Sequence, residues 1–494
     1  NDGTSRSLGI DAIWLSPFYP SPMADFGYDV SDYCNVHPMF GDLDTFDLLV
    51  EEAHQRQIKV IVDYVPNHTS DQHPWFLESR LSENNPKRDW YIWRDPKPGG
   101  KPPNNWGAVF GGSAWEWDET TGQYYFHHFL KEQPDLNWRN PEVKEAMLDV
   151  LRFWLDRGVD GFRMDVVGMI LKDPDFRDNP LNPITTWSLP ETDIFSRQLN
   201  IYNMDLDDVH EIISEFRKLL DSYEYRIAIG EVWGELPRWI KYYGVKGNGL
   251  HLPFNFRLIY LPWNMQSIRQ SVDELEAVLP EFAWPNFVLG NHDVPRLASR
   301  IGPEQARVAA MLLLTLRGTP TLYYGDEIGM ENGNITPENI RDPQGIRLGI
   351  KRSRDVSRTP MQWDSSQHAG FSTGEPWLPI APNFHSKNAA ALKDDPSSLL
   401  NLYRRLLNLR KETPALSSGS YRSLESKNND VYLFMREHPA GRCLVALNFS
   451  DQAQSISIPE EYGQTILSTY MDREGIGTLD KLPLRGNEGI IIKL

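Results

Sequence analysis

The sequence predicts an α/β protein in which parallel strands close into a barrel and two smaller regions are added. Three observations lead to this prediction: short apolar runs alternate with longer amphipathic stretches, one interruption of that alternation is long, and the pattern changes after residue 416. Alternating strands and helices form a parallel sheet, and this many repeats of the pair close the sheet into a barrel.

Seven short runs of apolar and β-branched residues are predicted to be the barrel strands. They span residues 11–16, 59–65, 160–166, 226–232, 251–256, 286–293 and 319–325. Between them apolar residues recur with helical spacing. These helical stretches span residues 43–57, 141–158, 207–223 and 304–318. A further helix, which starts near Leu399, is expected to close the barrel.

Two regions depart from this alternation and are predicted to be separate domains. Residues 67–137 are rich in Trp, Pro, Asn and Gly, and they are far too long for an ordinary loop between a strand and a helix. We expect this segment to form a small inserted domain, called domain B, in the loop that follows the third strand of a complete eight-stranded barrel. From residue 417, short alternating runs with turn residues predict a β-sandwich. The predicted domains are residues 1–66 and 138–416 (barrel), 67–137 (inserted) and 417–494 (C-terminal).

The predicted barrel is one strand short. Only nine residues precede the run IDAIWLS, whereas a strand and its helix need roughly 30 residues. Either this pair is missing from the chain or the strand count is wrong. We expect a (β/α)8 TIM barrel whose first strand is missing, in an N-terminally incomplete copy of an active enzyme. Because such a remnant exposes backbone groups on two strands, we expect this chain to aggregate or to show little activity.

The amino-acid composition excludes several classes of binding partner. A net charge of −18 argues against nucleic acid and against an anionic membrane surface, because both repel an acidic protein. No apolar run is long enough to span a bilayer, and the first residues contain no signal-peptide core. The two cysteines, Cys34 and Cys443, are too few for a disulfide framework. These features favour a cytoplasmic location and a neutral, small-molecule substrate.

Acidic residues close three of the predicted strands. Asp165, Glu231 and Asp293 lie near strand ends that meet on one face of such a barrel. Each alone could be a capping or ion-paired carboxylate, but three on one face favour catalysis. Hydrolysis of a glycoside needs one carboxylate to attack and another to protonate the leaving oxygen. Arg163 precedes Asp165 by two residues, on the same side of the strand, and is expected to keep it ionised.

Five short segments carry a resemblance to a known family. The segments DYVPNH (63–68), GFRMD (161–165), GEVW (230–233) and GNHD (290–293) resemble the four signature segments of the α-amylase family of glycoside hydrolases, in the family's order. The segment QPDLN (133–137) resembles the α-glucosidase and oligo-1,6-glucosidase branch. The resemblance extends from about Gly9 to the C-terminus.

The resemblance implies a role for each matching residue. Asp165 is the expected nucleophile, which forms a covalent β-glucosyl intermediate, and Glu231 is the expected acid and then base. Asp293 is similar to the third carboxylate, which holds hydroxyl groups of the sugar as the ring flattens. The residues expected to form hydrogen bonds with the bound ring are His68, Arg163 and His292.

Three further residues bear on specificity through the same resemblance. Tyr28 resembles the aromatic platform under the first glucose, and Asp29 resembles the group that binds its terminal hydroxyl. Arg354 matches an arginine that pairs with this aspartate and closes the pocket, unless it forms an ordinary surface ion pair. Val166 follows the nucleophile, where Val resembles α-1,6-preferring relatives and Thr resembles α-1,4-preferring relatives. We therefore expect isomaltose to be cleaved.

The expected function is that of a retaining, exo-acting α-glucosidase, which hydrolyses terminal non-reducing α-linked glucose (α-1,4, α-1,6 or both) from short oligosaccharides. The alternatives on the same scaffold are a transglucosidase, a sucrose-acting enzyme or an isomerase, which share the glucosyl intermediate. A more remote alternative is a non-catalytic barrel subunit with a membrane anchor. The retained carboxylates and the lack of an anchor segment argue against that subunit.

No cofactor is expected. Several relatives bind Ca²⁺ in the loop after the first strand, the part that the strand count finds missing. The acidic segments DLDTFD (42–47) and KDPDFRDN (172–179) lack the spacing of a dedicated calcium loop. The sequence therefore identifies no metal site, and the second segment is expected to shape the side of the site that holds the leaving sugar.

Overall fold

A computed structural model describes residues 7–185, 189–458 and 462–494. The described chain forms two compact units. The first unit comprises Asp11–Pro253 and Asp342–Ser353. The second comprises residues 7–10, Phe254–Arg341 and Arg354–Leu494. Each unit is described by itself.

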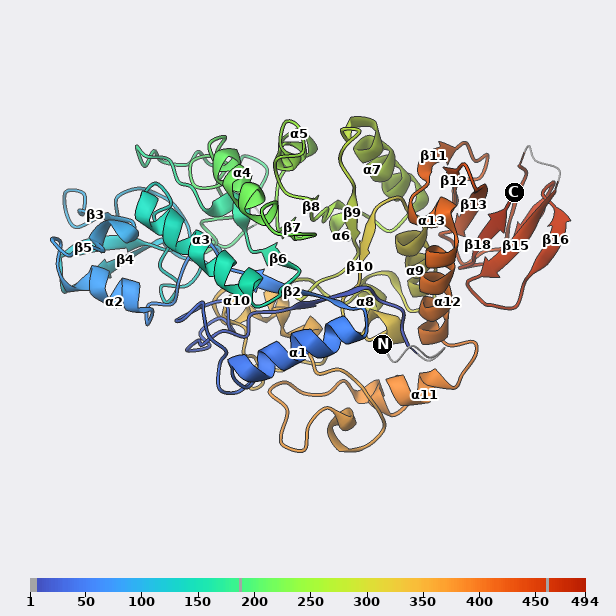
Figure 1. The fold of residues 1–494 in the computed structure, drawn as a ribbon, viewed down its shortest axis with the longest axis horizontal. Helices are drawn as coiled ribbons and strands as arrows, with labels where there is room; N and C mark the ends of the chain where they lie inside the picture. The colour runs from blue at the N-terminus through green and yellow to red at the C-terminus, as the bar shows by residue number, and fades with distance from the viewer. Residues whose placement is uncertain (1–6, 186–188, 459–461) are drawn as a thin grey trace. The chain divides into compact units, whose positions relative to one another are not determined.

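A parallel sheet of five strands forms the centre of the first unit (Figure 1). The strand order is β1-β2-β6-β7-β8, and every neighbouring pair is parallel. The strands are β1 (Ala12–Leu15), β2 (Lys59–Tyr64), β6 (Gly161–Met164), β7 (Ile227–Gly230) and β8 (Leu252–Pro253). Helical segments connect them: α1 (Leu43–Gln55), α3 (Pro141–Asp156), η2 (Val167–Met169), α4 (Val209–Leu220), α5 (Leu236–Trp239) and η3 (Ile240–Tyr243). This unit also contains α10 (Pro343–Leu348) and η5 (Ile350–Arg352).

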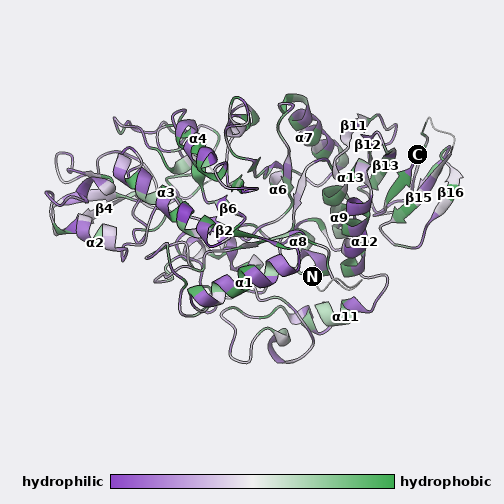
Figure 2. Cartoon of the chain, viewed as in Figure 1, coloured by the Kyte–Doolittle hydropathy of each residue, from purple (hydrophilic) through white to green (hydrophobic). Residues whose placement is uncertain are grey.

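The α3 sequence shows why these connections are helical. Asn140 caps the helix by accepting a hydrogen bond from the Glu142 N–H, and Pro141 occupies the first turn, where its missing N–H does no harm. Val143, Met147, Leu151 and Trp154 recur with helical spacing and are buried. Figure 2 shows the resulting mixture of polar and apolar residues along α3. One face of the helix therefore packs inward and the other faces solvent.

A small antiparallel sheet lies in the long segment between β2 and α3. Its order is β3-β5-β4, formed by β3 (Trp93–Arg94), β4 (Trp115–Asp118) and β5 (Gln123–Phe126). The helical elements α2 (Pro74–Leu81) and η1 (Arg88–Trp90) precede it. Its core is aromatic, with Trp106, Trp115 and Phe126 packed against Ile92. The tryptophans of this segment thus stabilise the insertion.

The second unit contains the parallel pair β9 (Asn286–Val288) and β10 (Thr319–Thr321). Its helical elements are α6 (Arg257–Tyr260), α7 (Met265–Val278), α8 (Leu297–Ile301), α9 (Gln305–Thr315), η4 (Asp326–Ile328), η6 (Arg354–Ser357), η7 (Gln367–Gly370), η8 (Pro382–His385), α11 (Ala389–Lys393), α12 (Leu399–Glu412) and α13 (Pro414–Ser417). Ten residues of α9 are buried, and Figure 2 colours this helix as mainly hydrophobic. A helix that is apolar on all sides must be covered on all sides.

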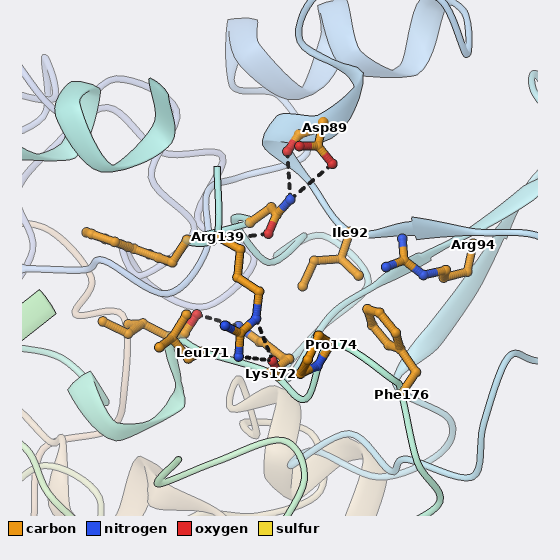
Figure 3. Close-up of a pocket in the computed structure, with 11 residues that line it drawn as sticks. Asp89, Ile92, Arg94, Arg139, Leu171, Lys172, Pro174 and Phe176 are labelled. Carbon is orange, nitrogen blue, oxygen red and sulfur yellow. Dashed lines mark hydrogen bonds between the residues drawn. The ribbon is translucent and has the colours of Figure 1, made fainter. Parts of the chain in front are cut away.

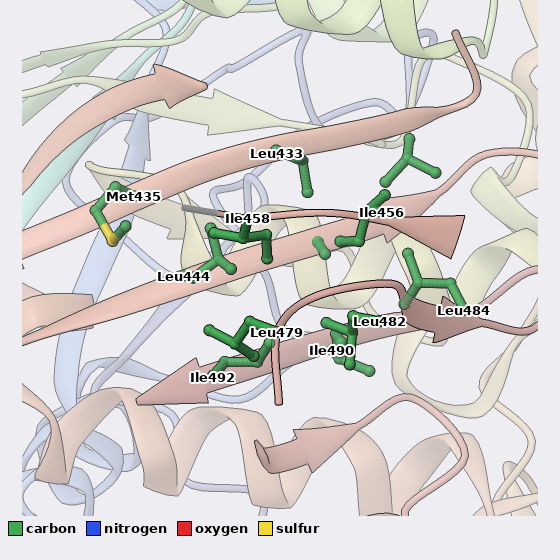
Figure 4. Packing of buried hydrophobic residues seen from close by; sticks show 12 residues of the cluster. Leu433, Met435, Leu444, Ile456, Ile458, Leu479, Leu482, Leu484, Ile490 and Ile492 are labelled. Atoms are coloured by element: carbon green, nitrogen blue, oxygen red, sulfur yellow. The ribbon is translucent and has the colours of Figure 1, made fainter. Parts of the chain in front are cut away.

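The chain ends in two antiparallel sheets. One has the order β11-β12-β13-β18-β15-β16, and the other pairs β14 with β17. The strands are β11 (Ser420–Leu424), β12 (Val431–His438), β13 (Gly441–Asn448), β14 (Gln454–Ile456), β15 (Tyr462–Ser468), β16 (Gly475–Thr478), β17 (Leu482–Leu484) and β18 (Gly489–Lys493). Leu433, Leu444, Ile456, Leu482 and Ile492 form one core between the two sheets (Figure 4). Alternating side chains therefore build the predicted sandwich.

Each of the seven predicted strand runs contains a strand, although the strands are shorter than the runs. The helix predicted to start near Leu399 is α12. Among the described strands, β1 is an edge strand of the five-stranded sheet, and β10 is an edge strand of the two-stranded sheet. Residues 1–6, most of the segment before the first predicted strand, lie outside the described residues. The missing strand and the domain boundaries stay predictions. Among the described helices, none is long and apolar enough to cross a membrane.

Asp160 joins the starts of β2 and β6. Its carboxylate accepts hydrogen bonds from the N–H of Val60 (2.9 Å) and from the ammonium of Lys59 (2.9 Å). It also lies 2.6 Å from Nε2 of His54. Burial acts to raise the pKa of Asp160, but these hydrogen bonds outweigh burial and lower it. The folded state therefore favours the ionised carboxylate.

We predict that Asp160→Asn lowers the free energy of unfolding by about 1–3 kcal/mol at pH 7, because it weakens hydrogen bonds to a buried charge. A pKa that is lower in the folded state stabilises the protein above the pKa of the unfolded state. This contribution is lost as the pH falls through the folded pKa. Urea denaturation at several pH values should therefore show the difference between the two proteins shrinking below about pH 4. As a control, Asp149→Asn on the exposed face of α3 should change stability by less than about 0.5 kcal/mol. A difference independent of pH would contradict this account.

Candidate active site

Two predicted carboxyl groups follow neighbouring strands of the first unit. The strands pair in register, Tyr64 opposite Met164 and Met164 opposite Gly230. Beyond this register, Asp165 donates its N–H to the carbonyl of Tyr64 (2.8 Å). Glu231 likewise donates its N–H to the carbonyl of Met164 (2.9 Å). Asp165 and Glu231 therefore come directly after adjacent parallel strands, at the edge where their carboxyl ends meet.

Arg163 on β6 joins three acidic side chains. It is buried, with 2% of its surface exposed. Its Nη1 donates to Oδ1 of Asp165 at 2.6 Å and to the two carboxylate oxygens of Asp63 at 3.1 and 3.2 Å. Its Nη2 donates to Glu231. Because a planar guanidinium presents its donors in several fixed directions, one residue can hold carboxyl groups from three strands.

Three buried carboxyl groups share this one guanidinium, so their protonation is linked. Burial raises the pKa of Asp63 to about 6, although Arg163 acts to lower it. Burial also raises the pKa of Asp165 well above its usual range, and the nearby Glu231 and Asp63 add to the effect of burial. Arg163 acts in the expected direction, because its charge and its hydrogen bond both lower the pKa of Asp165, and burial opposes this effect and outweighs it.

Tyr28 and Asp29 lie in the loop between β1 and α1. The hydroxyl of Tyr28 donates to Oδ2 of Asp63 (3.2 Å), which connects Tyr28 to the Arg163 cluster. Asp29 is fully buried and accepts hydrogen bonds from Ser21 Oγ (2.9 Å), the Ala24 N–H (2.8 Å) and the Asp25 N–H (3.0 Å). Burial raises its pKa, and these hydrogen bonds partly offset the rise. The loop thus holds Asp29 through its own backbone.

His68 is buried beside the same loop. Its Nε2 lies 3.2 Å from the carbonyl oxygen of Tyr28, and its Nδ1 lies 3.1 Å from Nδ2 of Asn67. Burial lowers the pKa of His68 to about 4. The ring is therefore neutral near pH 7 and carries one proton, on one of its two nitrogens.

Val166 adopts an unusual backbone conformation. Its φ of 35° and ψ of 42° lie in the left-handed region, which β-branched residues rarely occupy. Such a conformation costs of order 1–3 kcal/mol and persists only where its surroundings hold it. The carbonyl of Val166 accepts a hydrogen bond from the N–H of Met169 (2.8 Å). The chain therefore turns sharply directly after Asp165, with Val166 buried.

The remaining predicted residues belong to the second unit and surround Asp293. β9 ends at Val288, so Asp293 lies in the loop that follows it. Its Oδ1 accepts a hydrogen bond from Nη2 of Arg358 (2.9 Å) and lies 3.4 Å from Nη1 of Arg354. Nε2 of His292 lies 3.4 Å from its Oδ2. Two guanidinium groups thus hold the third carboxylate.

Three residues that contact the predicted site residues, around Arg163 and around Asp293, were not predicted from the sequence. Asp63 and Trp233 lie within the quoted segments, and Arg358 lies in KRSRDVSRTPMQW, the segment that contains Arg354. Trp233 donates its indole N–H to Oε1 of Glu231 (2.8 Å). Asp63 lies on β2 opposite Arg163 on β6, so the pairing of these predicted strands could have indicated its role. No sequence pattern of this kind indicates a role for Arg358.

The described residues contain no group of three or more His, Cys, Asp and Glu side chains arranged to hold a metal ion.

A family model for the α-amylase catalytic domain matches residues 5–419, and one for the C-terminal domain of maltogenic amylase matches residues 421–480. A probable α-glucosidase of Rhizobium meliloti (strain 1021) is 40% identical over 487 residues, which cover 94% of this chain and 88% of the relative. An oligo-1,6-glucosidase of Heyndrickxia coagulans is 38% identical, covering 96% of this chain and 91% of the relative.

Solved structures agree with these matches. The α-glucosyl transfer enzyme XgtA superposes with a TM-score of 0.92 at 40% identity, covering 99% of this chain and 92% of that chain. An inactive double mutant of MutB in complex with isomaltulose superposes with a TM-score of 0.88 at 36% identity, covering 98% and 92%. Together these matches confirm the predicted fold class, a TIM barrel with an inserted antiparallel sheet and a C-terminal β domain.

Proposed function

The chain belongs to the α-amylase family of glycoside hydrolases, and from this membership we propose that it is a retaining, exo-acting α-glucosidase. Its substrates are short oligosaccharides from which it removes the terminal non-reducing glucose. The observation that carries the proposal is the position of Asp165 and Glu231. They follow adjacent strands and share the guanidinium of Arg163.

The proposed reaction has two steps. In the first, a carboxylate oxygen of Asp165 attacks the anomeric carbon while Glu231 gives its proton to the leaving oxygen. The glycosidic bond breaks and a β-glucosyl ester forms on Asp165. In the second, Glu231 takes a proton from water, and the water oxygen displaces Asp165. Two inversions return the α-anomer, and both carboxyl groups regain their first protonation states.

The other predicted residues bind the glucose. In this proposal Tyr28 supports one face of the ring. His68, expected from the resemblance to bind the ring, has its two ring nitrogens beside Asn67 and the Tyr28 carbonyl, so it holds Tyr28 in place. Asp293 holds hydroxyl groups as the ring flattens, and Arg354 and Arg358 keep this carboxylate charged and in place. An ionised carboxylate forms shorter and stronger hydrogen bonds with hydroxyl groups than a neutral one does.

The second candidate function is glucosyl transfer. It is favoured by the names of two structural relatives, an α-glucosyl transfer enzyme and a trehalulose synthase. Transfer and hydrolysis share the glucosyl ester, and they differ in whether a sugar hydroxyl or water reaches it. The ratio of free glucose to transfer product at high sugar concentration separates the two functions.

We predict that Asp165→Asn lowers the turnover of a chromogenic α-glucoside by about 10⁴-fold or more, because the amide cannot attack. The far-UV circular dichroism and the melting transition should change little. NMR of the first product of the unsubstituted protein should show α-glucose. Early release of β-glucose would exclude a retaining mechanism.

For linkage, we predict that isomaltose is cleaved and that Val166→Thr raises the ratio of maltose to isomaltose activity. Val166 follows the nucleophile, so a hydroxyl group in place of a methyl group changes the site near the leaving sugar. Replacing one small group in a substrate pocket changes the discrimination between two substrates by roughly 1–3 kcal/mol, which is about 10–200-fold in the ratio of their kcat/KM values. A preference for maltose that Val166→Thr leaves unchanged would remove this explanation.

For the depth of the pocket, we predict that Arg354→Ala raises KM for disaccharides about tenfold or more, as expected when a charged hydrogen bond to a binding carboxylate is lost. It should also raise the relative activity on longer chains, because the resemblance implies that this arginine closes the non-reducing end of the pocket. Arg352→Ala is the matched control, because Arg352 pairs with Asp193 (2.6 Å). Equal effects of the two substitutions would contradict a specific role for Arg354.

A further inference from the structure

A series of buried hydrogen bonds leads from Lys172 to His68 in the first unit. Lys172 follows β6 by eight residues and is 4% exposed. Its Nζ lies 2.6 Å from Oδ2 of Asp135 and donates to Oδ1 of Asn67 at 3.0 Å. Nδ2 of Asn67 in turn lies 3.1 Å from Nδ1 of His68. Each of these four side chains is buried.

The lysine fixes the direction of these hydrogen bonds. An ammonium group has only donors, so Asn67 must present its oxygen to Lys172 and its amino group to His68. Nδ1 of His68 then accepts a hydrogen bond, and the single proton of the neutral ring lies on Nε2. The carbonyl oxygen of Tyr28 requires the same tautomer, because it is only an acceptor and lies 3.2 Å from Nε2.

Gln133 favours the opposite tautomer. Its Nε2 lies 3.0 Å from Nε2 of His68, a distance at which one nitrogen must accept. The orientation of its amide is set by the Leu130 N–H, which donates to its oxygen (3.1 Å), and by Asp25, which accepts from its Nε2 (3.3 Å). The imidazole therefore has two competing sets of partners. Each set contains one charged group, Lys172 or Asp25. Asn67 and the Tyr28 carbonyl both require the proton on Nε2, whereas only Gln133 opposes it, so the set that contains Lys172 prevails.

We propose that Lys172 is a positioning residue that selects, through Asn67, the tautomer of His68 in which Nε2–H donates to the backbone of Tyr28. This inference rests on the proposed function, in which Tyr28 supports the sugar. Both ring nitrogens of His68 bond within the protein, so His68 acts by holding Tyr28 in place. The hydroxyl of Tyr28 donates to Asp63, and Asp63 accepts from Arg163. Tyr28 therefore connects two series of hydrogen bonds. Its carbonyl is bonded to the series that begins at Lys172, and its hydroxyl is bonded to the series that leads to the guanidinium of Arg163, which joins Asp165 and Glu231.

The main chain and the ammonium of Lys172 are each held in place. Its carbonyl oxygen accepts two hydrogen bonds from Arg139, at 3.1 and 2.8 Å, in the wall of a cavity of about 250 Å³ (Figure 3). At the other end, Asp135 binds the ammonium and also lies 2.7 Å from Nδ1 of His128. Lys172 is therefore fixed at both ends.

Asp135 gives a matched pair of variants. Asp135→Asn removes the carboxylate but leaves the ammonium of Lys172 three acceptors: Asn67, the Ile170 carbonyl (3.4 Å) and the new amide oxygen. It should therefore leave the tautomer of His68 unchanged. The double variant Lys172→Met with Asp135→Asn removes both charges of the pair, so no buried charge is left without its partner. Without the ammonium, Asn67 can turn its amide, and Gln133 then favours the proton on Nδ1. The two variants differ only at residue 172.

The tautomer is measured by ¹⁵N NMR of the full chain labelled with [¹⁵N]histidine, with His68→Gln to identify the His68 signals. Protonated and unprotonated ring nitrogens have well-separated ¹⁵N shifts. We expect the proton on Nε2 in the unsubstituted protein and in Asp135→Asn, and increasingly on Nδ1 in the double variant. A proton on Nδ1 in the unsubstituted protein overturns the proposal, and it does so even if no variant folds. An unchanged tautomer in the double variant also overturns it.

Kinetics test the positioning role. Relative to Asp135→Asn, the double variant should raise KM for a chromogenic α-glucoside by about 3- to 10-fold, the effect of one lost hydrogen bond. Its kcat should change less. A tautomer that switches without any change in KM would overturn the positioning role. The NMR measurement needs no substrate, so a protein without α-glucosidase activity would contradict the proposed function and leave the tautomer result intact.

Discussion

The guanidinium of Arg163 is the group on which the acidic side chains of the first unit depend. Asp63, Asp165 and Glu231 all bond to it, and all four side chains are buried. Removing charges from water costs several kcal/mol for each ion, and that cost is offset only where the geometry supplies close partners. The parallel register of β2, β6 and β7 supplies this geometry, because it brings residues of three strands to one edge. The sheet is thus the support for an arrangement that loops alone could not hold as closely.

The same guanidinium explains why the cluster can serve acid and base chemistry. Burial raises the pKa of Asp63 and of Asp165, and the neighbouring carboxyl groups add to this rise, while the charge of Arg163 opposes it. A retaining glycosidase needs one protonated and one ionised carboxyl group in the same small volume. In the proposed function these two groups are Glu231 and Asp165, which share the guanidinium of Arg163.

Much of the fold and part of the site could be predicted from the sequence. The strands that end near Asp165 and Glu231 were predictable, because apolar runs and helical periodicity are local properties. Asp63, Arg358 and Lys172 were not predicted as site residues. Their partners are distant in sequence: Arg163 binds Asp63 across 100 residues, and Lys172 binds Asn67 across 105. Spacing along a strand also predicted the attraction of Arg163 for Asp165, but it could not show the larger, opposite effect of burial on the pKa of Asp165.

Val166 shows how the strand that supports the site ends. A valine in the left-handed region is unfavourable by itself, and glycine would adopt the same φ without strain. Glycine, however, would free the backbone directly after Asp165, and the position of that carboxylate would be less defined. The branched side chain is buried, so its packing opposes the strain while fixing the direction in which the chain leaves the strand. Val166, which is proposed to shape the site, therefore also holds Asp165, the proposed nucleophile, in place. For this reason Val166→Thr, which keeps the branch at Cβ, can change specificity near Asp165 while preserving the backbone that positions it.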